Sequence, residues 1–138
     1  MTHFDEIIVI DDNVTSNLLT ELNIKSIKSD QITTSFTDVN IAIARIRFLL
    51  NEPEEQKIVL LLDINMPVID GWGVLERINT FLSERSRNNI RIYILSSSIY
   101  HTDKYKAQQE PLITGYIEKP ILEEDIIDII YNNRTHLC

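Results

Sequence analysis

Carboxylate side chains stand directly after two short apolar segments of this sequence. Lys57 to Asp63 contains an unbroken run of branched apolar residues that ends in Asp63, and Glu6 to Ile10 is followed by Asp11 and Asp12. Uninterrupted apolar runs of this length are typical of central strands in a parallel sheet that is covered on both faces. Carboxylates at such strand ends lie at the crevice where open α/β sheets bind ligands, although Asp63 taken alone also suits a simple strand-end cap.

A hydroxyl group and an ammonium group follow two later apolar runs. Ser96 comes directly after Ile90 to Leu95, and Lys119 comes shortly after Ile113 to Ile117. A hydroxyl donates a hydrogen bond and an ammonium supplies positive charge, so both groups suit the oxygens of a phosphoryl group. Each strand that borders the crevice thus contributes a chemically suitable group.

Amphipathic helices are expected between the strands. Thr15 or Ser16 could cap the first helix, and Asp38 the second. The stretch from Thr102 to Gln109 has little apolar surface and should be the least firmly packed helix. Gln31 to Phe36 reads as a less apolar strand, nearer the edge of the sheet. The apolar positions that should face the core are Leu18, Leu19 and Leu22; Val39, Ala42, Ile43, Ile46, Leu49 and Leu50; Val74, Leu75, Ile78, Phe81 and Leu82; and Leu122, Ile126, Ile129 and Ile130.

Five alternations of strand and helix, with a polar loop at Ser83 to Asn89, predict a single α/β domain over residues 1–138. Right-handed crossovers then favour a doubly wound, flavodoxin-like (βα)5 fold with a parallel sheet in the order 2-1-3-4-5. Strands 1 and 3 are neighbours in this order, so Asp11, Asp12 and Asp63 should converge.

Three converging carboxylates repel one another, and a cation is the usual means of neutralising them. Oxygen-only ligands in a small, half-open cluster suit Mg²⁺, which keeps several waters and accepts one or two carboxylates. Mn²⁺ could substitute. The sequence therefore predicts a divalent metal site at the strand ends.

Composition excludes several classes of function. The formal net charge is -8 and no block of Lys or Arg is present, so direct nucleic-acid binding is not expected. No apolar run is long enough to span a membrane, and the N-terminus has no signal-peptide pattern. The one cysteine, Cys138, cannot form an internal disulfide. A soluble, cytoplasmic protein is expected.

The strand-end residues resemble those of the receiver domains of two-component response regulators, and the resemblance runs over nearly the whole chain. The motifs that carry it are Asp11-Asp12, Asp63 with Met66-Pro67 and Asp70-Gly71, Ser96, and Lys119-Pro120. Any one motif is weak, but their order and their positions at strand ends are specific. The resemblance implies a stand-alone, chemotaxis-regulator-like phosphoprotein with no output domain, which is a signalling module and not an enzyme.

The resemblance also implies roles for the strand-end residues. Asp63 would be the nucleophile that accepts a phosphoryl group from a phosphohistidine of a sensor histidine kinase or a phosphotransfer protein. Asp12, with Asp11 directly or through water, would bind Mg²⁺ together with Asp63 and the backbone carbonyl of Asn65. Lys119 would pair with the phosphoryl group.

Ser96 would hydrogen-bond the phosphoryl group, and Tyr116 matches the aromatic switch position that turns inward when the hydroxyl moves. The Lys119-Pro120 bond is often cis in this family. The chain departs from the family at Val39, where many relatives have glycine, and at Ser96, which replaces the commoner threonine and has a freer rotamer. Ser97 stands where alanine is frequent.

Two other classes of function remain as alternatives. A phosphohydrolase of the haloacid dehalogenase type also uses an aspartyl phosphate and Mg²⁺, but its nucleophile follows the first strand in an Asp-x-Asp arrangement, and no cap domain is evident here. A receiver fold that only binds partners is disfavoured because every reactive position is filled.

In a receiver domain without an output domain, the signal must pass through contacts with a downstream protein or through onward transfer of the phosphoryl group. Ile127 and Tyr131 lie away from the core stripe of the last helix. The surface formed by the fourth helix, the fifth strand and the fifth helix is the expected partner face, in a monomer or a weak dimer.

Overall fold

Strands at the centre of the molecule form one parallel sheet. The computed structural model describes residues 3–51, 56–97 and 101–132. The strands are β1 (Glu6–Ile10), β2 (Thr33–Phe36), β3 (Ile58–Asp63), β4 (Ile90–Ser96) and β5 (Gly115–Glu118), in the order β2-β1-β3-β4-β5. This is the predicted flavodoxin-like order, with the less apolar β2 at an edge.

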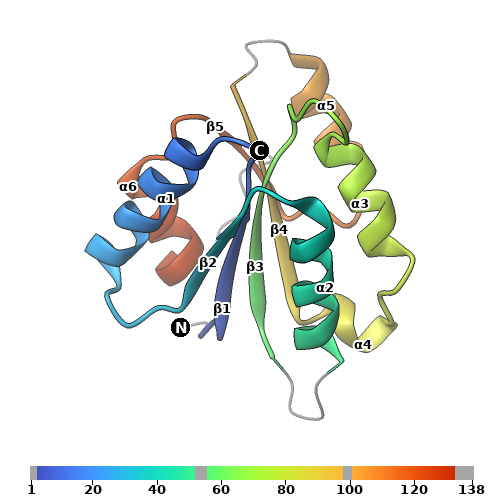
Figure 1. The fold of residues 1–138 in the computed structure, drawn as a ribbon, viewed down its shortest axis with the longest axis horizontal. Coiled ribbons are helices and arrows are strands. Elements are labelled where there is room, and N and C mark those ends of the chain that lie inside the picture. Colours follow the sequence, from blue (N-terminus) through green and yellow to red (C-terminus); the bar gives the residue numbers. More distant parts are fainter. Residues whose placement is uncertain (1–2, 52–55, 98–100, 133–138) are drawn as a thin grey trace.

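Helices cover both faces of the sheet (Figure 1). Helices α1 and α6 lie on one face, and α2, α3 and α5 lie on the other. The helices are α1 (Val14–Ile27), α2 (Val39–Leu50), α3 (Gly71–Asn79), α4 (Glu84–Arg87), α5 (His101–Gln109) and α6 (Glu123–Ile127), which continues into a π-helical turn, Asp128–Asn132. The fourth and fifth helices of the sequence prediction are thus α5 and α6. No helix in the described ranges is long and apolar enough to cross a membrane.

Alternate strand residues enter two separate cores. Ile8, Leu60 and Ile94 pack on the side of α2 and α3, whereas Val9 and Leu61 pack on the side of α1 and α6. Burial of both strand faces explains why these strands are apolar without polar alternation. The apolar faces predicted for the second, third and last helices are confirmed apart from Leu122, which is exposed, while Phe81 and Leu82 pack on the core just beyond α3.

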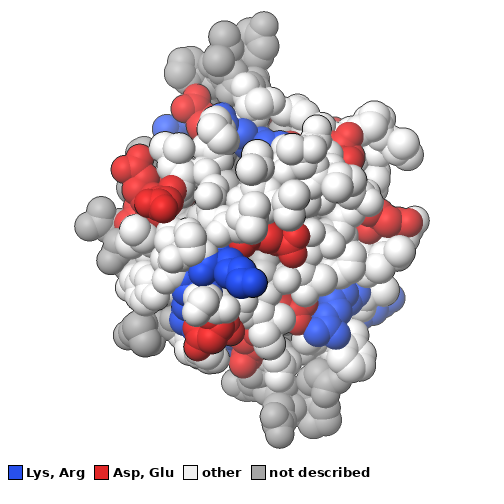
Figure 2. Space-filling model, turned by 60° about the vertical axis from the view of Figure 1, so that its left-hand side comes forward, with Lys and Arg blue, Asp and Glu red and all other residues white. Residues whose placement is uncertain are grey.

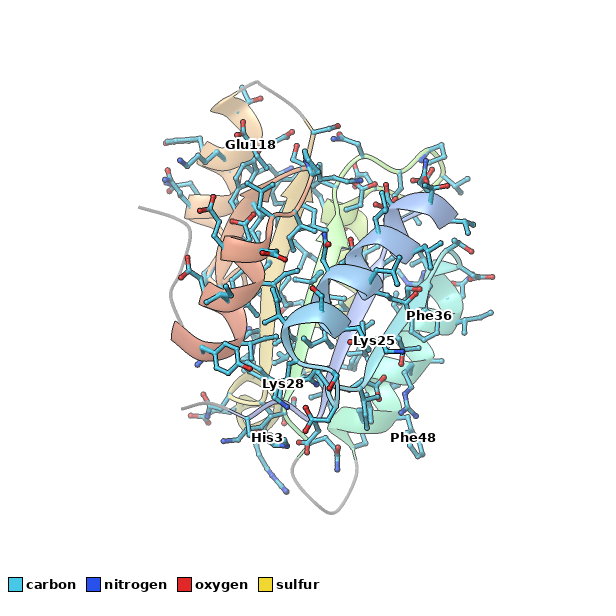
Figure 3. The ribbon with its side chains drawn as sticks, turned by 90° about the vertical axis from the view of Figure 1, so that its left-hand side faces the viewer. His3, Lys25, Lys28, Phe36, Phe48 and Glu118 are labelled. Carbon is cyan, nitrogen blue, oxygen red and sulfur yellow. The ribbon has the colours of Figure 1, made fainter. Side chains whose placement is uncertain are left out.

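The core face predicted for the first helix is wrong. Leu18, Leu19 and Leu22 are between 52% and 57% exposed, whereas Asn17 and Thr20 are buried with Ile24. The leucine spacing predicted the helix correctly, but the leucines lie on its outer, exposed face and not on the core face. Figure 3 looks onto this helix, which presents its outer face to the viewer.

Element boundaries differ from prediction at several places. The cap of α1 is Asn13, whose side chain accepts from the Ser16 N–H, and not Thr15 or Ser16. The polar stretch predicted as a loop contains α4, one turn with a Ser83–Ser86 capping box. Strands β2 and β5 each begin two residues later than predicted. Propensity alone cannot place such ends, because pairing with the neighbouring strand decides them.

Candidate functional site

The carboxylates of Asp11, Asp12 and Asp63 meet at the C-terminal edge of the sheet. One oxygen from each lies within 4.8 Å of the others. Asp11 and Asp63 are buried, and Asp12 is exposed. They converge because β1 and β3 pair in parallel, with Ile10 opposite Leu62, so both strands end at the same level. This is the juxtaposition expected from the sequence.

Asp11 is held at both carboxylate oxygens. Oδ1 accepts a hydrogen bond of 2.9 Å from the Asn13 backbone N–H, and Oδ2 accepts one of 2.7 Å from Nζ of Lys119. The lysine follows β5, so this contact joins the first and last strands through the site. Asp11 is therefore fixed in position as an ion-paired, hydrogen-bonded carboxylate.

The Asp63 carboxylate is buried, and its pKa is raised. Burial raises the pKa of Asp63 to about 6, and the negative charge of Asp11 adds to this increase. Two groups oppose this increase and lower the pKa of Asp63. The Asn65 backbone N–H lies 3.2 Å from Oδ1, and the Lys119 ammonium lies 3.8 Å from Oδ2. An opposing positive charge at this point would favour the ionised form.

Ser96 and Lys119 stand at adjacent strand ends. Ser96 is fully buried at the end of β4, and its carbonyl accepts from the backbone N–H of Lys119 at 2.9 Å. The Lys119–Pro120 peptide bond is cis, as the family resemblance suggested. Tyr116, the expected switch residue, is buried on β5 opposite Ile94.

The loop from β3 to α3 passes very close to Asp63. A methyl group on Gly71 would lie 2.8 Å from Cα of Ile64 and 2.9 Å from the carbonyl oxygen of Asp63, so only glycine fits without a backbone shift. Asp70 caps α3 by accepting from the Gly73 N–H at 3.0 Å. Gly71 thus allows the close approach of this loop to Asp63, and Asp70 caps the helix that follows.

Asn17 is a buried site residue that the sequence reasoning missed. Its side-chain amide donates to the backbone carbonyl of Asp11 at 3.0 Å and to that of Phe36 at 3.4 Å. Asn17 lies on the inward face of α1, which the leucine pattern had assigned to apolar residues. The sequence feature that could have indicated this role is a polar residue shortly after the Asp11-Asp12 pair.

The donor set fits a hard divalent cation. Carboxylate oxygens are the ligands that Mg²⁺ takes in proteins, and an exposed Asp12 leaves an open side for water or substrate oxygens. Among the described residues, Asp11, Asp12 and Asp63 form the one group of three acidic, histidine or cysteine side chains whose ligand atoms lie close enough together to share an ion.

A groove runs from this site along α1. It has a volume of about 400 Å³ and extends from Leu19 and Asn23 to Lys119 and Pro120. Leu19 lines the groove, and Leu18, Leu22 and Val14 of the same helix are also exposed. Figure 2 shows this side of the molecule, where a broad area of uncharged residues separates the charged side chains. The acidic site therefore has an apolar surface beside it.

Solved structures similar to this chain include response regulators. A two-component response regulator from Cytophaga hutchinsonii is 26% identical, with a TM-score of 0.82 over 96% of this chain and 97% of that chain. A response regulator receiver protein from Dyadobacter fermentans is 25% identical, with a TM-score of 0.74 over 90% and 95%. The chemotaxis protein CheY4 from Vibrio cholerae, 16% identical, has a TM-score of 0.70 over 92% and 96%, which shows the shared fold.

A flavodoxin-like sheet with an acidic cluster at its carboxyl edge defines the class as a receiver domain of two-component signalling. The comparison with protein families agrees, because residues 7–131 match the response regulator receiver domain. The chain belongs to that family. No curated protein matched the sequence.

Proposed function

We propose that Asp63 accepts a phosphoryl group from a phosphohistidine of a sensor histidine kinase or phosphotransfer protein. A carboxylate oxygen of Asp63 attacks phosphorus and forms the O–P bond, while the N–P bond breaks and the leaving imidazole takes up a proton. The observation that carries this proposal is the buried Asp63 carboxylate, which lies within 4.8 Å of Asp11 and 3.8 Å from the Lys119 ammonium.

The neighbouring groups have distinct roles in this transfer. Lys119 pairs with the phosphoryl oxygens, and the Ser96 hydroxyl hydrogen-bonds them. Asp11, Asp12, Asp63 and the backbone carbonyl of Asn65 would hold Mg²⁺. When bound, the ion neutralises charge on the carboxylates and on the transferring phosphoryl group. We place this exchange in the cytoplasm.

The phosphohistidine donor docks on the outer face of α1 in this proposal. Leu18, Leu19 and Leu22 present exposed apolar surface on α1, and Leu19 lines the groove that reaches Lys119. A protein donor must approach Asp63 closely and covers surface around the site, whereas a small phosphodonor gains nothing from this face. Exposed apolar patches of this kind mark protein contacts.

Output leaves through α5, β5 and α6, either by partner binding or after onward transfer of the phosphoryl group. Ala107 is the one buried side chain among those described in α5, so this helix is held weakly. Ile127 and Tyr131 are exposed, and Tyr116 is buried on β5, one of the elements of this face. Phosphorylation shifts the placement of α5 and so changes affinity for a partner or for a second copy.

Labelling with acetyl phosphate and Mg²⁺ tests the core of this proposal. Intact-mass analysis should find one added phosphoryl group on the wild type and none on Asp63→Asn. The matched control, Asp30→Asn, changes an exposed aspartate that ion-pairs with Lys28 and should label normally. Phosphate on Asp63→Asn would disprove the assignment, and an unlabelled wild type would favour a receiver fold that only binds partners.

A further inference from the structure

Asn17 takes part in a closed set of hydrogen bonds at the base of the acidic site. The backbone N–H of Asp11 donates to the carbonyl of Phe36 at 3.1 Å, and the Asn17 amide donates to the same carbonyl and to the carbonyl of Asp11. The ring of contacts therefore ties the end of β1 to the end of β2 and to the first turns of α1.

This ring fixes the backbone that carries two of the carboxylates. Asp11 is bonded at its N–H, at its carbonyl and at both carboxylate oxygens. Asp12 is the next residue and has no such contacts in the described part of the chain. The direction of the Asp12 carboxylate therefore depends on how firmly the Asp11 backbone is held.

The polar side chain at position 17 is unfavourable for packing alone. Asn17 is only 4% exposed, and its Oδ1 atom is buried without a hydrogen-bond partner among the described residues. Both neighbouring acceptors are carbonyl oxygens, so the NH₂ group must face them and Oδ1 must face away. Meanwhile three leucines of the same helix face outward. A buried acceptor without a partner costs stability, so the contacts that favour asparagine at this position are those of its NH₂ group.

We propose that Asn17 is a positioning residue for the divalent-metal site. Its two hydrogen bonds hold the β1–α1 junction so that Asp11 and Asp12 are oriented for the ion before it binds. This inference rests on the proposed function, because it concerns the Mg²⁺ that supports phosphoryl transfer. Partners that orient metal ligands typically change metal affinity by about 10- to 100-fold when they are removed.

Mg²⁺ titration of the wild type and its variants tests the proposal, with the fluorescence of Trp72 as the signal and calorimetry as a second measurement. Asn17→Leu should bind Mg²⁺ roughly tenfold more weakly than wild type, with a melting temperature in metal-free buffer within about 4 °C of wild type. Asn17→Ala serves if leucine does not fit. Asp12→Ala, which removes a proposed ligand, gives the reference for a damaged site.

Thr20→Val is the matched control. Thr20 is buried on the same face of α1 and makes no side-chain hydrogen bond in the described part of the chain. This variant should keep the wild-type Mg²⁺ affinity, so a general loosening of α1 would be recognised by a loss in both variants. Such a parallel loss would overturn the positioning role.

Hydrogen exchange without metal gives an independent measurement. The Asn13 backbone N–H is bonded to Asp11 Oδ1, and the Asp11 N–H is bonded to Phe36. Both amides should exchange faster in Asn17→Leu, and neither should in Thr20→Val. Wild-type Mg²⁺ affinity or unchanged exchange in a folded Asn17 variant would overturn this inference alone. Failure of the wild type to bind Mg²⁺ or to label would instead overturn the proposed function.

Discussion

Lys119 is ion-paired with Asp11, with Nζ 2.7 Å from Oδ2. The same ammonium is 3.8 Å from Oδ2 of Asp63, so it partly neutralises both buried carboxylates. The lysine is only partly exposed, which limits screening by solvent. The last strand thus contributes to the stability of the site as well as to its proposed chemistry.

Lys119→Met should destabilise the fold in metal-free buffer by about 2 kcal/mol, because it leaves two buried carboxylates without their cation. Added Mg²⁺ should restore part of the loss. Urea denaturation with EDTA and with Mg²⁺ measures both effects. Lys25→Met, on the exposed side of α1, is the control, and an equal loss in the two variants would contradict this account.

Asp63→Asn should stabilise the metal-free protein at neutral pH. The folded pKa of Asp63, about 6, exceeds the unfolded value near 3.9, so folding costs free energy whenever Asp63 is ionised. That cost is absent below about pH 4 and grows until the pH passes the folded pKa. Asparagine avoids it, so the variant should gain about 1 to 3 kcal/mol above pH 6.

Urea denaturation of both proteins between pH 4 and pH 8 measures this difference. The Asn65 N–H can still donate to the asparagine oxygen, so the loop contact is retained. A stability gain that is as large at pH 4 as at pH 8 would show that the carboxylate charge is not its cause.

Leu19→Glu and Leu22→Glu should each slow phosphotransfer from a protein donor by roughly tenfold, equal to about 1.4 kcal/mol of lost docking. The donors are the phosphorylated histidine domains of sensor kinases and phosphotransfer proteins from the same genome, tested as a panel. The fastest donor for the wild type is then used for each variant. Labelling by acetyl phosphate should not change.

The control for this surface is Ile41→Glu on α2. Ile41 is 58% exposed, close to the value for Leu19, but lies on the opposite side of the sheet. Equal transfer rates for all three variants, or a panel in which no protein donor labels the wild type, would rule out α1 as the docking face. Docking through leucines should also be nearly insensitive to salt, since charge screening does not weaken apolar contacts.

Beryllofluoride, a phosphoryl mimic, should change hydrogen exchange beyond the acidic site. Helix α5 has a thin apolar contact with the domain, so a small local change in free energy can shift its placement. Altered protection is expected within residues 101–131. Changes confined to the residues around Asp63 would contradict a signal through this face.

Partner binding or self-association through α5, β5 and α6 should be weakened by Ile127→Asp. The control Ile32→Asp alters an exposed isoleucine beside the edge strand β2. Sedimentation with and without beryllofluoride measures self-association, and binding to a downstream protein is measured once that protein is known. Equal behaviour of the two variants would place the output elsewhere.

The strand ends were predictable because short apolar runs and parallel pairing together determine where Asp11 and Asp63 meet. The strand positions and their parallel pairing can both be inferred without knowledge of side-chain contacts. The Asp70 cap was predictable for a similar reason, since a cap depends on residues close in the chain.

Helix α1 could not be predicted to the same depth. Its leucine spacing indicates a helix, but periodicity does not say which face is inward when polar residues have partners in the core. Asn17 is buried because the carbonyls of Asp11 and Phe36 accept its amide, and Phe36 is distant in the sequence. Contacts of that range appear only after the sheet has been assembled.

Gly71 restricts how the acidic site could be moved to another protein. The start of α3 lies against the peptide of Asp63 with no room for a methyl group. A designer who grafts the three aspartates and the lysine onto a new scaffold must therefore also carry over this glycine. Without it, even alanine would displace the backbone of Asp63.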